Sequence, residues 1–142
     1  MNKVIYQDSV GSPSRASGPF LKDAPSLPQT LRNALTDRFG LECRLTPIQT
    51  QALESGICEA NKHFLVSAPT NSGKTLVAFF RIFSEVLSKK VRCVYVTPLK
   101  ALAEEKRSEL EDLCEKVFQA GGRQVKVSIT TGDYQQTNDF LG

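Results

Sequence analysis

Hydrophobic positions along the chain form short strand-like runs separated by longer helix-like runs. The strand-like runs, β-branched or alternating with polar residues, lie at 64–67, 91–96 and 125–129. Between them, apolar residues with helical spacing run from Leu76 to Leu87 and from about Leu99 to Ala120. Strand, helix, strand, helix, strand is the order of a parallel sheet with right-handed crossovers. We therefore predict an α/β fold with a parallel sheet and flanking helices.

Two shorter helices are predicted before the first strand. Leu31, Leu35 and Phe39 recur every four residues, so they share one helical face, and Gly40 closes this helix. The segment from Thr46 to about Ala60 is predicted as the next helix.

The second of these helices starts with a recognisable capping pattern. Thr46 has the position of an N-cap, Pro47 occupies the first helical position, and Gln49 stands where a side chain reaches back in a capping box. This pattern gives Gln49 a purely structural interpretation.

The first 27 residues differ in composition from the rest. Serine, proline and glycine are dense between Asp8 and Pro28, and such a density of turn formers argues against a regular element. We expect residues 1–27 to be a flexible arm and residues 28–142 to form the domain.

Composition excludes several classes of protein. The 142 residues, 40% of them hydrophobic, suit one globular domain, and a net charge of +3 is too small to indicate a polyanionic partner. The four cysteines are irregularly spaced and His63 is the only histidine, so neither a zinc site nor a disulfide framework is indicated. No apolar run approaches the roughly 20 residues of a membrane span, and the start lacks a secretory signal. We expect an intracellular protein, cytoplasmic or nuclear, without a membrane partner.

The first predicted strand leads into a loop with the character of a phosphate-binding loop. Small residues are followed by Gly-Lys-Thr and an apolar helix, so backbone N–H groups and a helix N-terminus would face an anion. Lys74 would add a point charge, and the Thr75 hydroxyl would bind the magnesium ion of the nucleotide. We predict a site for a nucleoside triphosphate with Mg²⁺ in the loop Ala68, Pro69, Thr70, Asn71, Ser72, Gly73, Lys74 and Thr75.

The loop departs from the general pattern at two positions. Ala68 stands where the pattern begins with glycine, and Asn71 stands where many such loops carry another glycine. Asparagine tolerates a positive φ, so the second departure is a mild one. The alternative is an ordinary strand–turn–helix junction, with Thr75 as a helix-start residue and Lys74 as a solvated charge.

Two further loops are expected at the same edge of the sheet. Thr97–Lys100 follows the second predicted strand and Thr130–Tyr134 follows the third. Ligands of open parallel sheets bind at the carboxyl ends of the strands, where these loops would join Ala68–Thr75.

Four segments together resemble the first motifs of superfamily 2 DExD/H-box helicases. They are Leu45–Gln49, Ala68–Thr75, Tyr95–Lys106 and Thr131–Tyr134, and the group most similar contains Ski-type RNA helicases, spliceosomal unwindases and archaeal repair helicases. The resemblance covers about residues 28–142. It implies the N-terminal part of a RecA-like P-loop domain that binds ATP and Mg²⁺, with Lys74 and Thr75 serving catalysis.

The resemblance also implies roles outside the phosphate loop. It implies that Gln49 reads the adenine edge, while the capping box remains an equally good interpretation. It implies that the turn and helix start at Thr97, Pro98, Leu99, Lys100 and Ala101 contact a nucleic-acid backbone, and that Thr131 and Gly132 extend this track. A plain strand-end turn is the alternative for the last two.

The family's acidic motif is not found in the sequence. Superfamily 2 enzymes carry an Asp that holds magnesium and a Glu that positions water, and no such segment follows Tyr134. The second motor domain, with its arginines, is missing as well. We expect the front half of motor domain 1, truncated or excised before the Asp-Glu motif and inactive alone.

The leading hypothesis is an ATP-dependent RNA or DNA helicase whose partner is single-stranded or partly duplex nucleic acid. A non-catalytic remnant that binds nucleotide or nucleic acid is the alternative from another class. A different P-loop NTPase or a small-molecule kinase is disfavoured, because no substrate lid or guanine-reading motif follows the loop.

Overall fold

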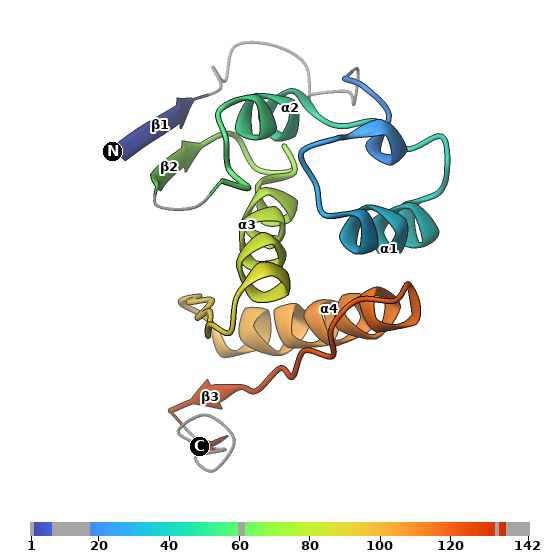
Figure 1. Cartoon of the computed structure of the whole chain (residues 1–142). Coiled ribbons are helices and arrows are strands. Elements are labelled where there is room, and N and C mark those ends of the chain that lie inside the picture. The colour runs from blue at the N-terminus through green and yellow to red at the C-terminus, as the bar shows by residue number, and fades with distance from the viewer. Residues whose placement is uncertain (1, 7–17, 60–61, 133, 136–142) are drawn as a thin grey trace.

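The computed structural model describes residues 2–6, 18–59, 62–132 and 134–135, and Figure 1 shows the arrangement of its elements. In chain order these are β1 (Asn2–Tyr6), the 3-10 helix η1 (Leu21–Asp23), α1 (Gln29–Phe39), α2 (Pro47–Glu54), β2 (His63–Ser67), α3 (Lys74–Ser88), α4 (Lys100–Gln119), β3 (Thr130–Thr131) and β4 (Tyr134–Gln135).

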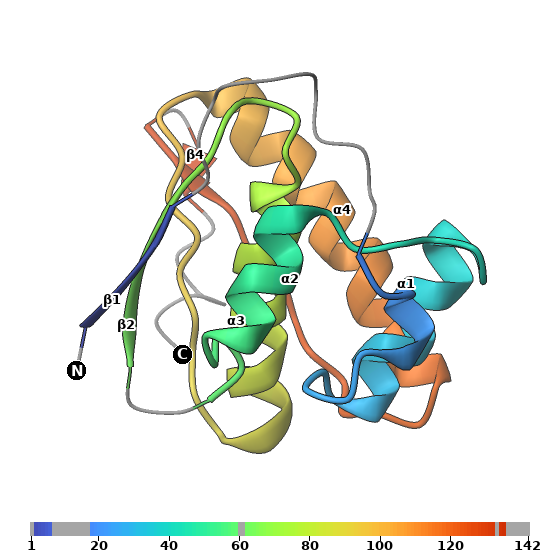
Figure 2. The ribbon, with the colours of Figure 1, turned by 90° about the horizontal axis from the view of Figure 1, so that it is seen from above.

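A parallel pair of strands forms one side of the molecule. β1 pairs with β2 in register, so that Ile5 lies opposite Val66. Side chains alternate between the two faces: Ile5 is buried, whereas Val4 and Leu65 are exposed. Both views show α2 and α3 on one side of this pair (Figures 1 and 2). The predicted class, a parallel sheet with flanking helices, is confirmed.

Helix α3 forms the centre of the core. Phe79, Phe80 and Phe83 are buried, so these aromatic rings serve packing and offer no stacking platform for bases. The helix lies against α2, which in turn contacts β1.

Helices α1 and α4 pack against each other. Leu31 and Leu35 are fully buried, as predicted, but Phe39 is 48% exposed and does not continue their apolar face. Phe39 is the last residue of α1, and its ring lies under the Arg38 guanidinium at 5.5 Å. Gly40 caps the helix with a φ of 94°, in agreement with the prediction.

Helix α2 is shorter than predicted, because it ends at Glu54 and does not reach Ala60. Gly56 adopts a left-handed conformation with a φ of 85°. Its N–H donates to Leu53 O at 3.1 Å, and the Ile57 N–H donates to Ala52 O at 3.0 Å. These two bonds form a Schellman motif, which the glycine after Ser55 could have indicated.

The second and third predicted strands are absent from the described part of the chain. Segments 91–96 and 125–129 form no strand there, and within the described residues the short antiparallel pair β3–β4 follows them. A strand needs a neighbour to receive its backbone hydrogen bonds, and alternation of side chains does not supply one. In 91–96, Val94 and Val96 are 66% and 85% exposed.

The expected flexible arm is wrong for the parts of residues 1–27 that the structure describes. Residues 2–6 form β1, and residues 7–17 lie outside the described ranges. Leu21, Ala24 and Leu27 are buried in the core, and η1 lies against α1. The turn formers between these apolar residues shape the segment without keeping it out of the core. No helix within the described ranges is long and apolar enough to cross a membrane.

Replacing Leu21 by alanine tests whether this segment belongs to the core. Because the side chain is 1% exposed, we expect the free energy of unfolding to fall by about 2 to 5 kcal/mol. Leu41→Ala is the matched control, since that leucine is 63% exposed and should change stability by about 0.5 kcal/mol or less. Urea denaturation measures both, and equal effects would restore the interpretation as an arm.

Candidate functional site

The loop between β2 and α3 turns sharply through two left-handed residues. Asn71 has a φ of 63°, and Gly73, the N-cap of α3, has a φ of 90° and a ψ of 22°. The expectation that asparagine tolerates this conformation is confirmed. The turn brings the chain from the carboxyl end of β2 directly to the N-terminus of α3.

Gly73 is required by the surrounding protein as well as by its own backbone conformation. A Cβ at this position would collide with Nε2 of Gln49 and would lie 3.1 Å from Oγ1 of Thr46. These contacts exclude a side chain at Gly73 even with no ligand bound.

Gln49 links the start of α2 to this loop. Its Oε1 accepts a hydrogen bond from the Thr46 N–H at 3.0 Å, and its own N–H donates to Thr46 Oγ1 at 3.4 Å, which confirms the capping box. Its Nε2 donates to the Gly73 carbonyl oxygen at 3.2 Å. The side chain is buried, so both ends of the carboxamide are used inside the protein. Nothing in the sequence indicated the bond to Gly73.

Ser72 carries a buried polar atom without a protein partner in the described part of the chain. The residue is 1% exposed, and its Oγ makes no hydrogen bond there. Its N–H donates to Pro69 O at 3.3 Å. Leaving a buried hydroxyl unpaired costs free energy, and such exceptions are often explained by an absent ligand or water.

Lys74 and Thr75 open α3 directly after Gly73. Lys74 is exposed, and Thr75 is half-buried. Gly73 has no side chain to cap the helix, so the first N–H groups of α3 receive no side-chain cap. The sequence-predicted residues of this loop therefore lie at a helix N-terminus, where anions bind favourably.

In Figure 2 the loops at 97–100 and 130–132 lie toward the same end of the molecule as the phosphate loop. In Figure 1 they lie well apart from it. Helix α4 starts at Lys100, after an N-cap residue Leu99 that is 60% exposed. Thr131 is half-buried and its Oγ1 has no partner within the described ranges, whereas Gly132 is exposed. Asp133 lies outside the described residues.

The cysteines do not offer a nucleophile. Burial raises the pKa of the Cys43, Cys58 and Cys93 thiols, and it raises that of Cys114 to about 11. Thiols with raised pKa values carry little thiolate near neutral pH and are poor nucleophiles.

Two glycine substitutions separate backbone strain from the collision at the loop. Gly121 has nearly the same φ, 93°, and nothing lies within 4 Å of a Cβ added there. Gly121→Ala should therefore cost only the left-handed strain, about 1 to 2 kcal/mol. Gly73→Ala should cost about 1 kcal/mol more, because Gln49 must move and release its bonds. Equal losses in urea denaturation would show that the contact with Gln49 does not constrain the loop.

Comparisons with known proteins agree with this geometry. The family model described as DEAD/DEAH box helicase matches residues 46–140, which is more than half of the chain. No solved structure matches.

Curated relatives carry the name ATP-dependent DNA helicase Hel308. The chain is 40% identical over 114 residues to the protein of Pyrococcus abyssi, which covers 80% of this chain and 14% of the relative. It is 38% identical over 120 residues to that of Thermococcus kodakarensis, covering 84% of this chain and 10% of the relative. The chain thus spans about a seventh or less of these relatives. Phosphate loop, capping box and family match lead to one assignment: the chain belongs to the DEAD/DEAH box helicase family.

Proposed function

We propose that these residues are the ATP-binding front half of motor domain 1 of an ATP-dependent helicase. The observation that carries the proposal is the loop before α3: a left-handed Gly73, then Lys74 and Thr75 at a helix start, beside the buried unpaired hydroxyl of Ser72. Because the relatives are named DNA helicases, we propose DNA as the nucleic acid. The proposed partial RecA-like domain takes in β1 and η1 together with residues 28–142.

The residues present fit a triphosphate with its magnesium ion. The backbone N–H groups from Ala68 to Thr75 and those of the first turn of α3 would donate to phosphate oxygens. The exceptions are Pro69, which has no N–H, and Ser72, whose N–H donates to Pro69 O. Lys74 would hold the phosphates by charge. Ser72 Oγ would gain the partner that it lacks. The Thr75 hydroxyl would bind magnesium, which neutralises phosphate charge when bound. The chemical character of these groups supports Mg-ATP as the ligand.

Gln49 would read the adenine edge with the second N–H of its Nε2 and the second lone pair of its Oε1, because a carboxamide can make two bonds at each end. Its carboxamide already serves Thr46 and Gly73, at 3.0 and 3.2 Å. We propose that the bond from Nε2 to Gly73 is retained when nucleotide binds, because it holds the loop in its left-handed turn. The capping role alone remains the alternative for this residue.

The nucleic-acid backbone would lie along the start of α4 and the β3 region. Thr97, Pro98, Leu99, Lys100 and Ala101 form the turn into α4, and a helix start with a lysine attracts phosphate without reading base sequence. Thr131 and Gly132 would extend this track. A remnant that binds nucleic acid without turnover is the alternative function.

Hydrolysis would need groups that these residues do not supply. The family's water-positioning Glu and second-domain arginines have no counterpart in the sequence, so we propose nucleotide binding without turnover by the 142 residues alone.

Replacing Lys74 by alanine tests the nucleotide site. Loss of a charge-assisted contact to phosphate should cost about 1.5 to 3 kcal/mol, or roughly one to two decades of affinity for Mg-ATP. Lys126→Ala, an exposed lysine outside the loop, should bind as the parent does. Titration calorimetry measures both, and unchanged affinity in Lys74→Ala would reject the phosphate-loop assignment.

Replacing Lys100 by alanine tests the nucleic-acid track. Binding of single-stranded DNA should be weak and indifferent to sequence, and its logarithm should fall with log salt by about 0.7 for each phosphate neutralised. Lys100→Ala should reduce this slope by about one contact for all sequences alike.

The N-terminal basic residues are the confounder in this experiment. Truncation before Ala24 would remove β1 and the buried Leu21, so an Arg15→Ala, Lys22→Ala double variant is the better control. A slope that depends on these two residues and ignores Lys100 would reject the track and leave the nucleotide site intact.

A further inference from the structure

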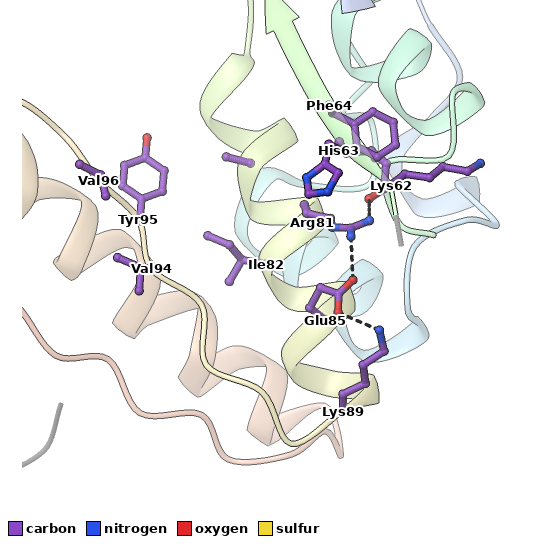
Figure 3. Close-up of a pocket in the computed structure, with 12 residues that line it drawn as sticks. Lys62, His63, Phe64, Arg81, Ile82, Glu85, Lys89, Val94, Tyr95 and Val96 are labelled. Carbon is purple, nitrogen blue, oxygen red and sulfur yellow. Dashed lines mark hydrogen bonds and ion pairs between the residues drawn. The ribbon is translucent and has the colours of Figure 1, made fainter. Parts of the chain in front are cut away.

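Arg81 lies about two turns after the start of α3 and binds the chain that follows α2. Its Nη1 donates to Ile57 O at 3.1 Å and also to Glu59 O. Its Nη2 forms an ion pair with Glu85 at 2.9 Å, one turn further along the same helix. Figure 3 shows the Arg81 side chain between Phe64 and Glu85, with a dashed line to Glu85. The proposed nucleotide and nucleic-acid sites do not include this residue.

The contacts of Arg81 use the shape of its guanidinium group. Two backbone carbonyls and one carboxylate accept its N–H groups, and Cζ lies 5.9 Å from the centre of the Phe64 ring. A planar guanidinium presents several donors in a fixed fork, whereas a lysine ammonium is a single point charge. The side chain is 26% exposed, so these bonds are partly shielded from water. Arg81 therefore holds segment 57–59 in a defined position against α3.

The segment that Arg81 binds is in turn bonded to the end of α2. The Ile57 N–H donates to Ala52 O in α2 at 3.0 Å, and the Glu59 N–H donates to Gly56 O at 2.9 Å. Ile57 also packs in the core, where it is 3% exposed, but apolar packing has no preferred direction. The two bonds from Arg81 to backbone carbonyls do have a direction. Arg81 therefore anchors the carboxyl end of α2 to α3.

Helix α2 is thereby bonded to α3 at both ends. At its start, Gln49 Nε2 donates to the carbonyl oxygen of Gly73, the N-cap of α3. At its end, Arg81 binds the turn that closes the helix. Helix α2 has only 8 residues, and so short a helix depends on its surroundings for stability and orientation. The bonds of Arg81 therefore limit rotation of α2 about the Gln49–Gly73 bond.

We propose that Arg81 is a positioning residue for base recognition, which fixes α2 so that the Gln49 carboxamide faces the adenine of the nucleotide. This inference rests on the proposed function, in which Gln49 reads the adenine edge. Hydrogen bonds weaken steeply when their length and angle change, so a small rotation of α2 would weaken the bonds from Gln49 to the base. The backbone N–H groups of the phosphate loop would keep their positions. Arg81 acts through Gln49 and does not touch the ligand.

Three ligands separate recognition of the base from recognition of the phosphates. ITP has a carbonyl oxygen where ATP has the adenine amino group, so it cannot donate to Gln49 Oε1, and inorganic triphosphate has no base. We expect the parent chain to bind Mg-ATP about fivefold more tightly than Mg-ITP, the effect of about one hydrogen bond.

Arg81→Met tests the inference on the whole chain, because methionine keeps an unbranched apolar stem and has no donor. The variant should reduce the preference for Mg-ATP over Mg-ITP to about twofold or less. Its affinity for Mg-triphosphate should stay within about a factor of two of the parent's, because the phosphate loop is unchanged. Titration calorimetry measures all three ligands. Arg81→Lys keeps a cation with fewer placed donors, and its preference should lie between those of the parent and Arg81→Met.

Arg123→Met is the matched control. Arg123 likewise donates to two backbone carbonyls, Val86 O at 3.3 Å and Lys89 O at 3.0 Å, and neither belongs to α2 or to segment 57–59. Its loss should lower stability in a similar way and leave the preference for Mg-ATP over Mg-ITP as in the parent.

The side-chain amide of Gln49 gives a second readout, without nucleotide. Its Nε2 protons in the NMR spectrum report on the bond to Gly73 O. We expect Arg81→Met to shift these signals and to speed their exchange with water, and Arg123→Met to leave them unchanged. A purely local role of Arg81 in holding segment 57–59 would not move them.

Three results would overturn the inference and leave the nucleotide site intact. They are equal affinity of the parent for Mg-ATP and Mg-ITP, a preference that Arg81→Met preserves, and Gln49 signals that Arg81→Met does not change. Equal losses of Mg-ATP and Mg-triphosphate affinity in Arg81→Met would overturn it as well, because Arg81 would then act on the phosphate loop as a whole. A parent chain that binds none of the three ligands would reject the proposed function and, with it, this inference.

Discussion

The bond between Gln49 and Gly73 connects the parts of this chain that the proposed chemistry needs. One carboxamide caps α2 through Thr46 and, with its other end, holds the carbonyl of the left-handed glycine that starts α3. A side chain on Gly73 would break this arrangement, so helix cap, loop and glycine constrain one another. The position of α2 against α3 thereby fixes the direction in which the N–H groups at the start of α3 point.

The segment before α1 supports the same region from the other side. β1 pairs with β2, the strand that leads into the loop, and Ile5 is buried beneath it. The carbonyl oxygen of Leu45, next to the capping box, accepts a hydrogen bond from the N–H of Gly18, which precedes η1 and α1. The N-terminal residues therefore help to hold β2, which leads into the loop, and the capping box of α2, which is bonded to it. They are structural parts of the site.

The sequence patterns predicted the structural features that depend on neighbouring residues and missed those that depend on partners far along the chain. The capping box and the left-handed Asn71 follow from neighbouring residues alone, and α4 ends at Gln119, next to the predicted end at Ala120. Segments 91–96 and 125–129 have strand-like sequences, but whether they pair depends on a neighbour that the described chain does not provide. β1 was missed because a dense run of turn formers follows it, and the Gln49–Gly73 bond joins residues 24 apart.

Amide hydrogen exchange with and without Mg-ATP tests the central claim most directly. If the loop receives phosphate, amides from Thr70 to Thr75 should exchange more slowly with Mg-ATP, since their N–H groups would gain acceptors. The Nε2 signal of Gln49 should remain that of a bonded amide, because its link to Gly73 holds the turn. Saturating Mg-ATP that leaves these loop amides at their ligand-free rates would contradict the account.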